Sequence, residues 1–261
     1  MKSGLPISSE QKNEYQPDEP LVSVITVVRN GEKTLERTIQ SVISQDYKNI
    51  EYIIIDGAST DTTTHIIKKY DSSINYWSSE PDKGISEAFN KGINLASGSW
   101  INFLNCGDCY INSQVISKAS QFFAQAPIVT GFSKCGAVSL PRIKLHNSTP
   151  LRRRAKISHQ ASFVHVDVFN KIGLFDERYQ IRMDYDFWLR ALKTHSFVMV
   201  NDTLVDYAPV GISSMSASTK IFYEEEKRAN HEHHIDMVSG IDLYLSIKYY
   251  ADRVRRFALR R

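Results

Sequence analysis

The chain has 261 residues, of which 42% are hydrophobic and 23% charged, so it is long enough to bury one sizeable core as a single α/β domain. Its three cysteines provide no framework of paired disulfides, which excludes a small disulfide-stapled module and favours a reducing, cytoplasmic compartment. The net charge of +3 argues against a protein that coats nucleic acid, and no apolar run reaches the length of about 20 residues that crosses a bilayer.

Residues 1–20 are polar, lack the apolar core of a signal peptide and are expected to form a loose leader. From residue 21 to about 132, apolar runs alternate with helical patterns, which is typical of β-α-β units. The pattern predicts strands at 21–28, 52–55, 74–77, 100–104 and 128–131, with helices beginning at residue 35 and covering 86–96. We therefore predict an α/β fold with a mostly parallel sheet flanked by helices on both faces.

The second half of the chain has a less regular pattern. Residues 133–156 are rich in Gly, Pro, Ser and basic residues and are expected to form a mobile loop. Further regular elements are predicted at 163–172, at 185–193, as two short strands at 197–200 and 204–207, and as helix from about 217. The chain thus divides into a leader (1–20), an α/β domain (21–210) and a helical C-terminal extension (211–261).

Asp56 directly follows the second predicted strand, at the edge where open parallel sheets bind ligands. An Asx turn and a helix cap account for Ser59 and Asp61 in the same stretch, but they explain Asp56 less well. A carboxylate in this place can accept hydrogen bonds from a base or a ribose. We therefore expect Asp56 to take part in nucleotide recognition.

The loop after the fourth strand runs from Asn105 to Cys109. Gly107 permits a tight backbone, and Asp108 offers the hard oxygen ligand that Mg²⁺ or Mn²⁺ bridging a diphosphate requires. Cys106 and Cys109 form a C-x-x-C pair, which can also be a redox pair or half of a zinc site. The sequence contains no second C-x-x-C for a four-ligand zinc site, and the redox alternative stays open.

A series of motifs, taken in order and spacing, resembles the family 2 glycosyltransferases of the GT-A fold. They are VSVITVVRN at 22–30, DGASTD at 56–61, SEPDKGI at 79–85, FNKG at 89–92, LNCGD at 104–108, HQ at 159–160 and MDYDFWL at 183–189. The resemblance extends over about residues 21–207, and the most similar members are bacterial enzymes that build capsule, O-antigen or exopolysaccharide.

This resemblance implies an inverting transferase that moves a sugar from a nucleotide-sugar donor, commonly a UDP-sugar, to a glycan or lipid-linked acceptor. It implies donor-site residues around the nucleoside and near the ribose or donor sugar, which are Val27, Arg29, Asp56, Asp82 and Lys83. Asp108 takes the position of the metal ligand, and Asp184 takes that of the catalytic base. The metal would be Mg²⁺ or Mn²⁺.

Two positions depart from the family pattern. Many relatives have two acids in the metal loop and Glu-Asp at the base, whereas this chain has Gly107 before Asp108 and Met183 before Asp184. A second metal ligand must then come from elsewhere. His159 is either that ligand, a donor to the departing phosphate, or a buried histidine bonded to a backbone carbonyl.

The same residues disfavour two other enzyme classes. The first strand lacks the G-x-G-x-x-G turn of dinucleotide-dependent oxidoreductases, and no Gly-rich basic loop of a nucleotidyltransferase follows it. A non-catalytic nucleotide-sugar-binding subunit of a polysaccharide assembly complex is the remaining alternative. The presence of both Asp108 and Asp184 argues against it.

The C-terminal stretch 241–261 carries six basic and two acidic residues, with apolar residues at three- and four-residue spacing. This pattern predicts a basic amphipathic helix, which either lies on the inner face of an anionic membrane or packs on the catalytic domain. Just before it, His231, His233 and His234 lie in a Glu-rich stretch and are expected to form a solvated helix face.

Overall fold

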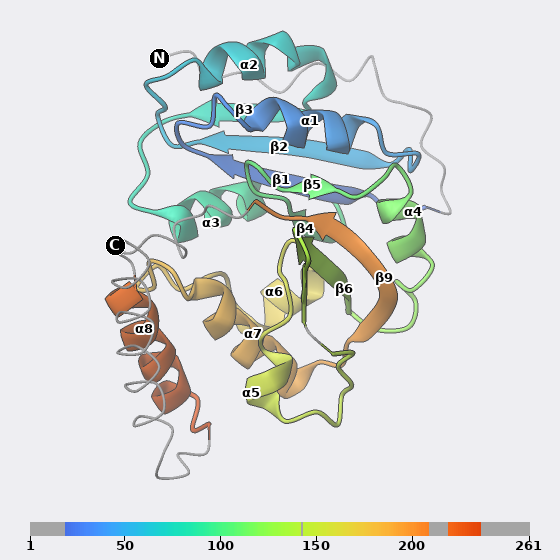
Figure 1. Ribbon diagram of the computed structural model, residues 1–261, viewed down its shortest axis with the longest axis vertical. Coiled ribbons are helices and arrows are strands. Elements are labelled where there is room, and N and C mark those ends of the chain that lie inside the picture. Colours follow the sequence, from blue (N-terminus) through green and yellow to red (C-terminus); the bar gives the residue numbers. More distant parts are fainter. Residues whose placement is uncertain (1–18, 142, 209–218, 236–261) are drawn as a thin grey trace.

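The computed structural model describes residues 19–141, 143–208 and 219–235 (Figure 1). The expected leader up to residue 18 and the expected basic helix at 241–261 lie outside the described residues. The strands are β1 (Val22–Val28), β2 (Ile50–Asp56), β3 (Tyr76–Ser79), β4 (Trp100–Phe103), β5 (Cys109–Tyr110), β6 (Ile128–Cys135), β7 (Val138–Leu140), β8 (Ser162–His165) and β9 (Val198–Asp206). The helices are α1 (Leu35–Ile43), α2 (Thr63–Lys69), α3 (Ile85–Leu95), α4 (Val115–Ser120), α5 (Leu151–Arg154), α6 (Val166–Ile172), α7 (Met183–Thr194) and α8 (Thr219–Glu232).

The described strands form one sheet in the order β3-β2-β1-β4-β8-β6-β9-β5, with β7 paired to β6. The first four strands are parallel because α1, α2 and α3 provide the crossovers that parallel pairing requires. Beyond β4 the sheet is mixed, since β8 is antiparallel to both of its neighbours while β6 and β9 are parallel. The predicted α/β class is confirmed, and the mostly parallel arrangement holds for the first half only.

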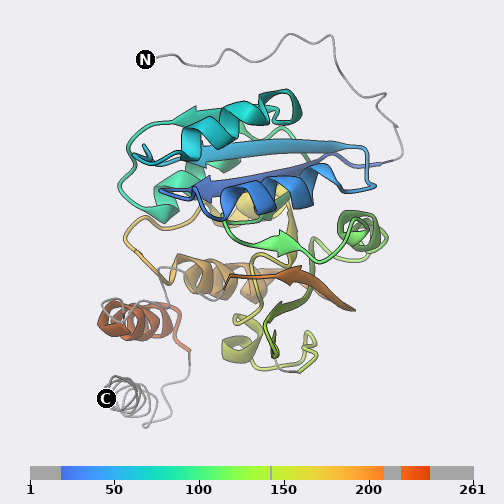
Figure 2. The same cartoon turned by 45° about the horizontal axis from the view of Figure 1, so that its top comes forward.

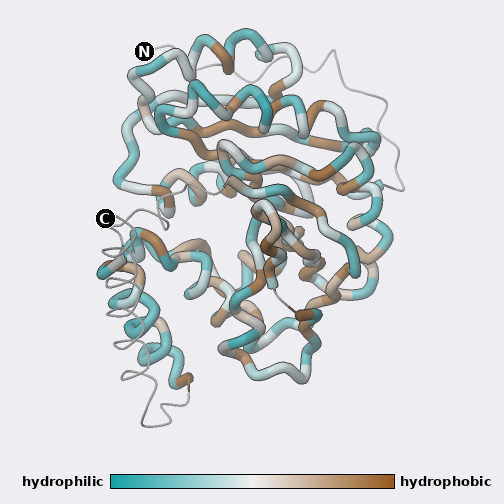
Figure 3. The backbone as a smooth tube through the Cα atoms, in the orientation of Figure 1, coloured by the Kyte–Doolittle hydropathy of each residue, from teal (hydrophilic) through white to brown (hydrophobic). Residues whose placement is uncertain are grey.

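Both faces of the central strands are covered, so β1 is buried along its whole length. Val24 and Ile54 belong to the core on the side of Leu35 in α1, whereas Ile25 belongs to the core on the side of Phe89 in α3. Figure 3 shows the hydrophobic residues concentrated along these strands and hydrophilic residues along α8. Figure 2 shows α7 and α8 lying side by side away from the α1–α2 layer.

Two expectations for the second half were wrong. Residues 133–156 contain the end of β6, the strand β7 and the helix α5, because β6 continues past Gly131 and finds partners in both β7 and β9. The two short strands expected between 197 and 207 are one strand, β9, with register shifts opposite Phe132. Exposed polar residues at Asn201 and Asp202 interrupt its apolar pattern without ending its pairing.

Within the described ranges, none of the helices combines the length and the apolar character needed to span a bilayer.

Candidate active site

The loops that follow β1, β2 and β3 meet at one edge of the sheet. Val27 is buried in β1, and Arg29 is exposed just after it. A side chain on Gly57, after β2, would collide with the carboxylate of Asp82, and the Cβ of Arg29 lies 3.6 Å from the same point. Arg29 and Asp82 are therefore brought together over a backbone that only glycine leaves open. Lys83 is exposed beside them.

Asp56 is completely buried at the end of β2. Its carboxylate accepts hydrogen bonds from the backbone N–H of Ser59 at 3.0 Å, from the Ser79 hydroxyl at 2.5 Å and from the Ser59 hydroxyl. The expected turn is present, and Asp56 is its acceptor. Three of the roughly four acceptor positions of a carboxylate are thus used internally. The contact of Asp56 with a nucleotide stays a prediction.

The loop from Asn105 to Asp108 is fixed by α1. Gly107 has a φ of +97°, which favours glycine, and its N–H donates to Thr38 Oγ1 at 2.9 Å. Arg37 donates to the carbonyl of Gly107 at 3.2 Å and to the sulfur of Cys109 at 2.9 Å. The backbone of this loop is held on both sides of Asp108.

The cysteines of this loop are free thiols. Burial raises the pKa of Cys106 to about 11, and burial also raises the pKa of Cys109. Redox chemistry requires the thiolate, which burial disfavours at both cysteines. In the described part of the chain, no three His, Cys, Asp or Glu residues are grouped as a metal-binding set. The redox and zinc alternatives are therefore disfavoured.

Asp108 has 5% of its surface exposed. Burial raises its pKa to about 6, although the N–H of Ala208, the charge of His159 and a hydrogen bond from Gln160 oppose this shift. A nearby cation would stabilise the ionised form of such a desolvated carboxylate.

Asn105 supplies a second oxygen in the same loop. Its Oδ1 is buried and has no hydrogen-bond partner among the described residues. Asn105 and Asp108 together offer two hard oxygen donors, and Mg²⁺ commonly binds through one or two protein ligands plus the phosphates of a substrate. The residues present fit a divalent cation shared with a diphosphate. The sequence did not single out Asn105 as a candidate oxygen donor, and only its place in the loop after a strand pointed to it.

His159 connects this loop with the predicted base. Its Nε2 lies 3.0 Å from the amide nitrogen of Asn105, and its Nδ1 lies 3.5 Å from Oδ2 of Asp184. Nδ1 faces Asp184 and can donate its N–H to that carboxylate, while the role of Nε2 toward Asn105 depends on the tautomer of the ring. The structure does not decide between a metal ligand and a donor to the departing phosphate. The ring of His159 makes polar contacts with the side chains of Asn105 and Asp184, so His159 lies between the loop of Asp108 and Asp184.

Asp184 lies in the first turn of α7, with 23% of its side chain exposed. Burial opposes its ionisation, but a hydrogen bond from His159, the charge of Arg182 at 3.7 Å and the N–H of Tyr185 outweigh it and hold the pKa of Asp184 below its usual value. The carboxylate is therefore ionised at neutral pH and available to accept a proton.

Helix α8 supports the start of α7 through buried acids. Glu225 accepts hydrogen bonds from three consecutive backbone N–H groups, those of residues 180, 181 and 182, at 2.7, 2.9 and 2.9 Å. Glu226 lies 3.4 Å from the guanidinium of Arg182, which also stacks on Phe222. These acids are 2% exposed, although the Glu-rich stretch suggested a solvated face. The sequence did not predict the burial of Glu225 and Glu226, because their partners at residues 180–182 lie about 45 residues earlier in the chain.

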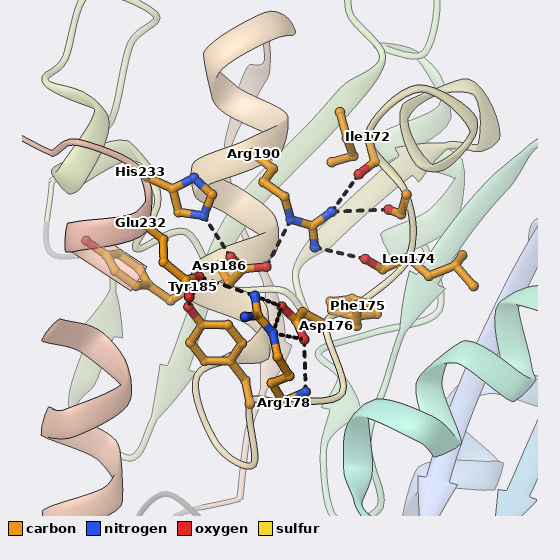
Figure 4. Close-up of polar contacts among 12 residues, drawn as sticks. Ile172, Leu174, Phe175, Asp176, Arg178, Tyr185, Asp186, Arg190, Glu232 and His233 are labelled. Atoms are coloured by element: carbon orange, nitrogen blue, oxygen red, sulfur yellow. Dashed lines mark hydrogen bonds and ion pairs between the residues drawn. The ribbon is translucent and has the colours of Figure 1, made fainter. Parts of the chain in front are cut away.

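Figure 4 shows a second contact between α7 and α8, centred on Asp186. His233 Nε2 lies 2.7 Å from one oxygen of Asp186, and Arg190 donates to the other at 2.9 Å. Asp186 is therefore buried and held by a partner on each oxygen, as a structural residue is. For His233 the expected solvated position was wrong, while His231 and His234 are exposed as predicted.

Comparisons with known proteins show which family this chain is related to. The family model for "Glycosyl transferase family 2" matches residues 23–189. An uncharacterized glycosyltransferase of Mycobacterium tuberculosis is 33% identical over 211 residues, which cover 78% of this chain and 80% of the relative. A PGL/p-HBAD biosynthesis glycosyltransferase of Mycobacterium bovis is 26% identical over 193 residues, covering 69% of this chain and 72% of the relative.

Solved structures share the fold. The crystal structure of S. aureus TarS 1–349 in complex with UDP-GlcNAc has a TM-score of 0.69 at 20% identity over 81% of this chain. This chain spans just under two thirds, 66%, of that TarS fragment. The mannosyltransferase PcManGT from Pyrobaculum calidifontis, in complex with GDP-Man and Mn²⁺, has a TM-score of 0.65 at 13% identity, covering 91% of this chain and 76% of that one. Both support the GT-A fold expected from the motifs.

Proposed function

This chain belongs to glycosyl transferase family 2, and on that premise we propose that it transfers a sugar from a nucleoside diphosphate donor to an acceptor hydroxyl, with inversion at the anomeric carbon. The observation that carries the proposal is the contact chain that joins Asn105, in the loop of Asp108, through His159 to Asp184. It brings oxygen donors for a cation and an ionised carboxylate to one site. A metal-assisted single displacement with inversion uses both of these chemical functions.

In the proposed reaction, Asp184 accepts the proton of the acceptor hydroxyl while that oxygen forms a bond to the anomeric carbon. The bond from this carbon to the diphosphate breaks in the same step, and the nucleoside diphosphate leaves. A divalent cation held by Asp108 and Asn105 would supply positive charge for the leaving diphosphate. His159 orients Asp184 through its Nδ1–H and keeps the pKa of the carboxylate low.

For the donor we propose a UDP-sugar. The support is the likeness of the fold to a TarS structure that contains UDP-GlcNAc, together with the strand-end residues Arg29, Asp56 and Asp82. For the acceptor we propose a glycan or lipid-linked molecule of the cell surface. The relatives include glycosyltransferases named for PGL/p-HBAD biosynthesis, so such biosynthetic glycosyltransferases are the support for an acceptor that is itself a biosynthetic intermediate.

The test is a panel of nucleotide sugars, containing UDP-glucose, UDP-galactose, UDP-GlcNAc and GDP-mannose, assayed for nucleotide release with Mg²⁺ or Mn²⁺ present. We expect one UDP-sugar to be turned over fastest, and NMR of the transferred sugar to show the anomeric configuration opposite to that of the donor. Retention of configuration would contradict the single displacement. Tight donor binding without turnover of any sugar, with or without acceptors, would favour the non-catalytic binding subunit.

A further inference from the structure

The segment 133–156, here named the basic segment, has an unusual charge. It contains seven basic residues and no acidic residue, in a chain whose net charge is only +3. The basic residues are Lys134, Arg142, Lys144, Arg152, Arg153, Arg154 and Lys156. The segment comprises the end of β6, the strand β7 and the helix α5, and Figure 1 shows α5 at the opposite end of the molecule from α2.

The same segment exposes apolar side chains. Five large hydrophobic residues are exposed in the described part of the chain, and three of them lie here: Val138 at 46%, Leu140 at 36% and Ile143 at 59%. Val138 and Leu140 are two residues apart in β7 and therefore point to the same face of that strand. Every residue of β7 is exposed, and within the described sheet the strand pairs only with β6.

From this coincidence of charge and exposed apolar surface we propose that the basic segment docks the protein on an anionic lipid bilayer. Val138, Leu140 and Ile143 would enter the interface, and the exposed Lys144 and Arg153 of the same segment would contact the lipid phosphates. Each basic residue near an anionic membrane contributes about 1 kcal/mol to the binding free energy. The apolar side chains add binding free energy by entering the bilayer interface, which a nucleic acid does not offer.

The segment leads directly into the active site. Lys156 lies 3.2 Å from Glu226, which lies 3.4 Å from Arg182, which in turn lies 3.7 Å from Asp184. The next residue, Ile157, is buried in the core that also contains Tyr185 of α7. The basic segment is thus linked through three ion pairs to Asp184, which the proposed reaction uses as its base. This last step rests on the proposed function, but the docking itself does not.

The test is sedimentation of the full-length chain with vesicles of phosphatidylglycerol and phosphatidylethanolamine, and with phosphatidylcholine vesicles for comparison. Wild type is expected to bind the anionic vesicles and to bind the neutral ones much more weakly. The triple variant Val138→Ser, Leu140→Ser, Ile143→Ser should bind the anionic vesicles at least about tenfold more weakly. The double variant Lys144→Ser, Arg153→Ser should also bind the anionic vesicles about tenfold more weakly than wild type.

A matched control removes exposed apolar side chains elsewhere. Ile43 in α1 and Leu95 in α3 are 43% and 41% exposed, so the variant Ile43→Ser, Leu95→Ser should bind vesicles like wild type. Ile143→Trp adds a gain of function, since an interfacial tryptophan should tighten binding and shift its fluorescence to the blue. Circular dichroism establishes that each variant is folded.

Three outcomes would overturn the docking proposal: no binding of wild type to anionic vesicles, equal binding by the triple variant, or an equal loss in the control variant. Equal binding by the triple variant would also be the result if only residues 241–261 contacted lipid. None of these readouts requires turnover, so failure of the proposed transferase activity and failure of the docking are distinguishable.

Discussion

Strands β1 to β4 and the elements from β6 to α8 both contribute residues to the proposed site, but they hold these candidate residues in different ways. In the first half, Asp56 and Asp82 accept hydrogen bonds from residues two or three positions further along the chain, at Ser59 and Gly84. In the second half, Asp184 depends on His159, and the start of its helix depends on Glu225, about 40 residues later.

This difference shows that the residues of the second half depend on packing between segments far apart in the sequence, whereas Asp56 and Asp82 in the first half are held largely by nearby residues. The family model ends at residue 189, so α8 lies outside the matched part of the chain. Even so, α8 provides Glu225, which accepts hydrogen bonds from the backbone before Asp184, and Glu226, which pairs with the side chain of Arg182. We expect changes in the first half to alter donor and metal binding, and changes in the second half to alter proton transfer and stability.

The largest expected effect is the loss of transfer activity when the metal is removed, which tests the role of the first half of the chain. Treatment with EDTA should lower the transfer rate by about 10³-fold, because a cation at a leaving diphosphate supplies several kcal/mol of charge stabilisation. Mn²⁺ or Mg²⁺ should restore wild type, whereas Asp108→Asn should stay inactive and folded. Calorimetric titration of the variant with donor should show no effect of the metal. Full turnover in EDTA would contradict the assignment of Asp108.

The next effect tests the second half, through the base. Asp184→Asn keeps the size of the side chain but cannot accept a proton, so transfer should fall by about 10²-fold or more while donor affinity stays unchanged. Asp167 is a matched control, because it also lies in the first turn of a helix with a histidine, His165, at 3.4 Å. Asp167→Asn should retain wild-type transfer. A near wild-type rate for Asp184→Asn would mean that the base lies elsewhere.

A smaller effect concerns the support from α8. Replacing Glu225 by Gln removes the charge that accepts three backbone N–H groups, and the free energy of unfolding should fall by about 2 kcal/mol. Its neighbour Glu224 is exposed and pairs only with Lys220 among the contacts described, so Glu224→Gln should change stability by less than about 0.5 kcal/mol. Chemical denaturation measures both. Equal losses would show that the buried contacts of Glu225 contribute nothing specific.

The smallest effect is a shift in pH dependence. His159→Gln removes the N–H that stabilises the Asp184 carboxylate, while the burial that opposes ionisation remains. The pKa of Asp184 therefore rises, and the acid limb of the transfer rate should move to higher pH. His165→Gln, beside Asp167, should leave the limb where it is in wild type. An unchanged limb in His159→Gln would exclude His159 as the residue that lowers this pKa.

The sequence by itself determined the α/β class, the first four strands and the positions of the polar residues that follow them. These features depend on local rules: apolar runs predict buried strands, and the ends of parallel strands meet at one edge. Asp56 could therefore be placed at this edge from its position after a strand, whereas Asp82 was placed only through the motifs that resemble the family.

Only the tertiary structure decided how the second half is built. The mixed strands, the continuous β9 and the burial of Glu225, Glu226 and His233 depend on partners far away in the sequence, which no local pattern encodes. A Glu-rich helix has the same sequence whether its acids face water or backbone N–H groups. The choice is made by which element packs against it, because a buried carboxylate is tolerated only where donors are already in place.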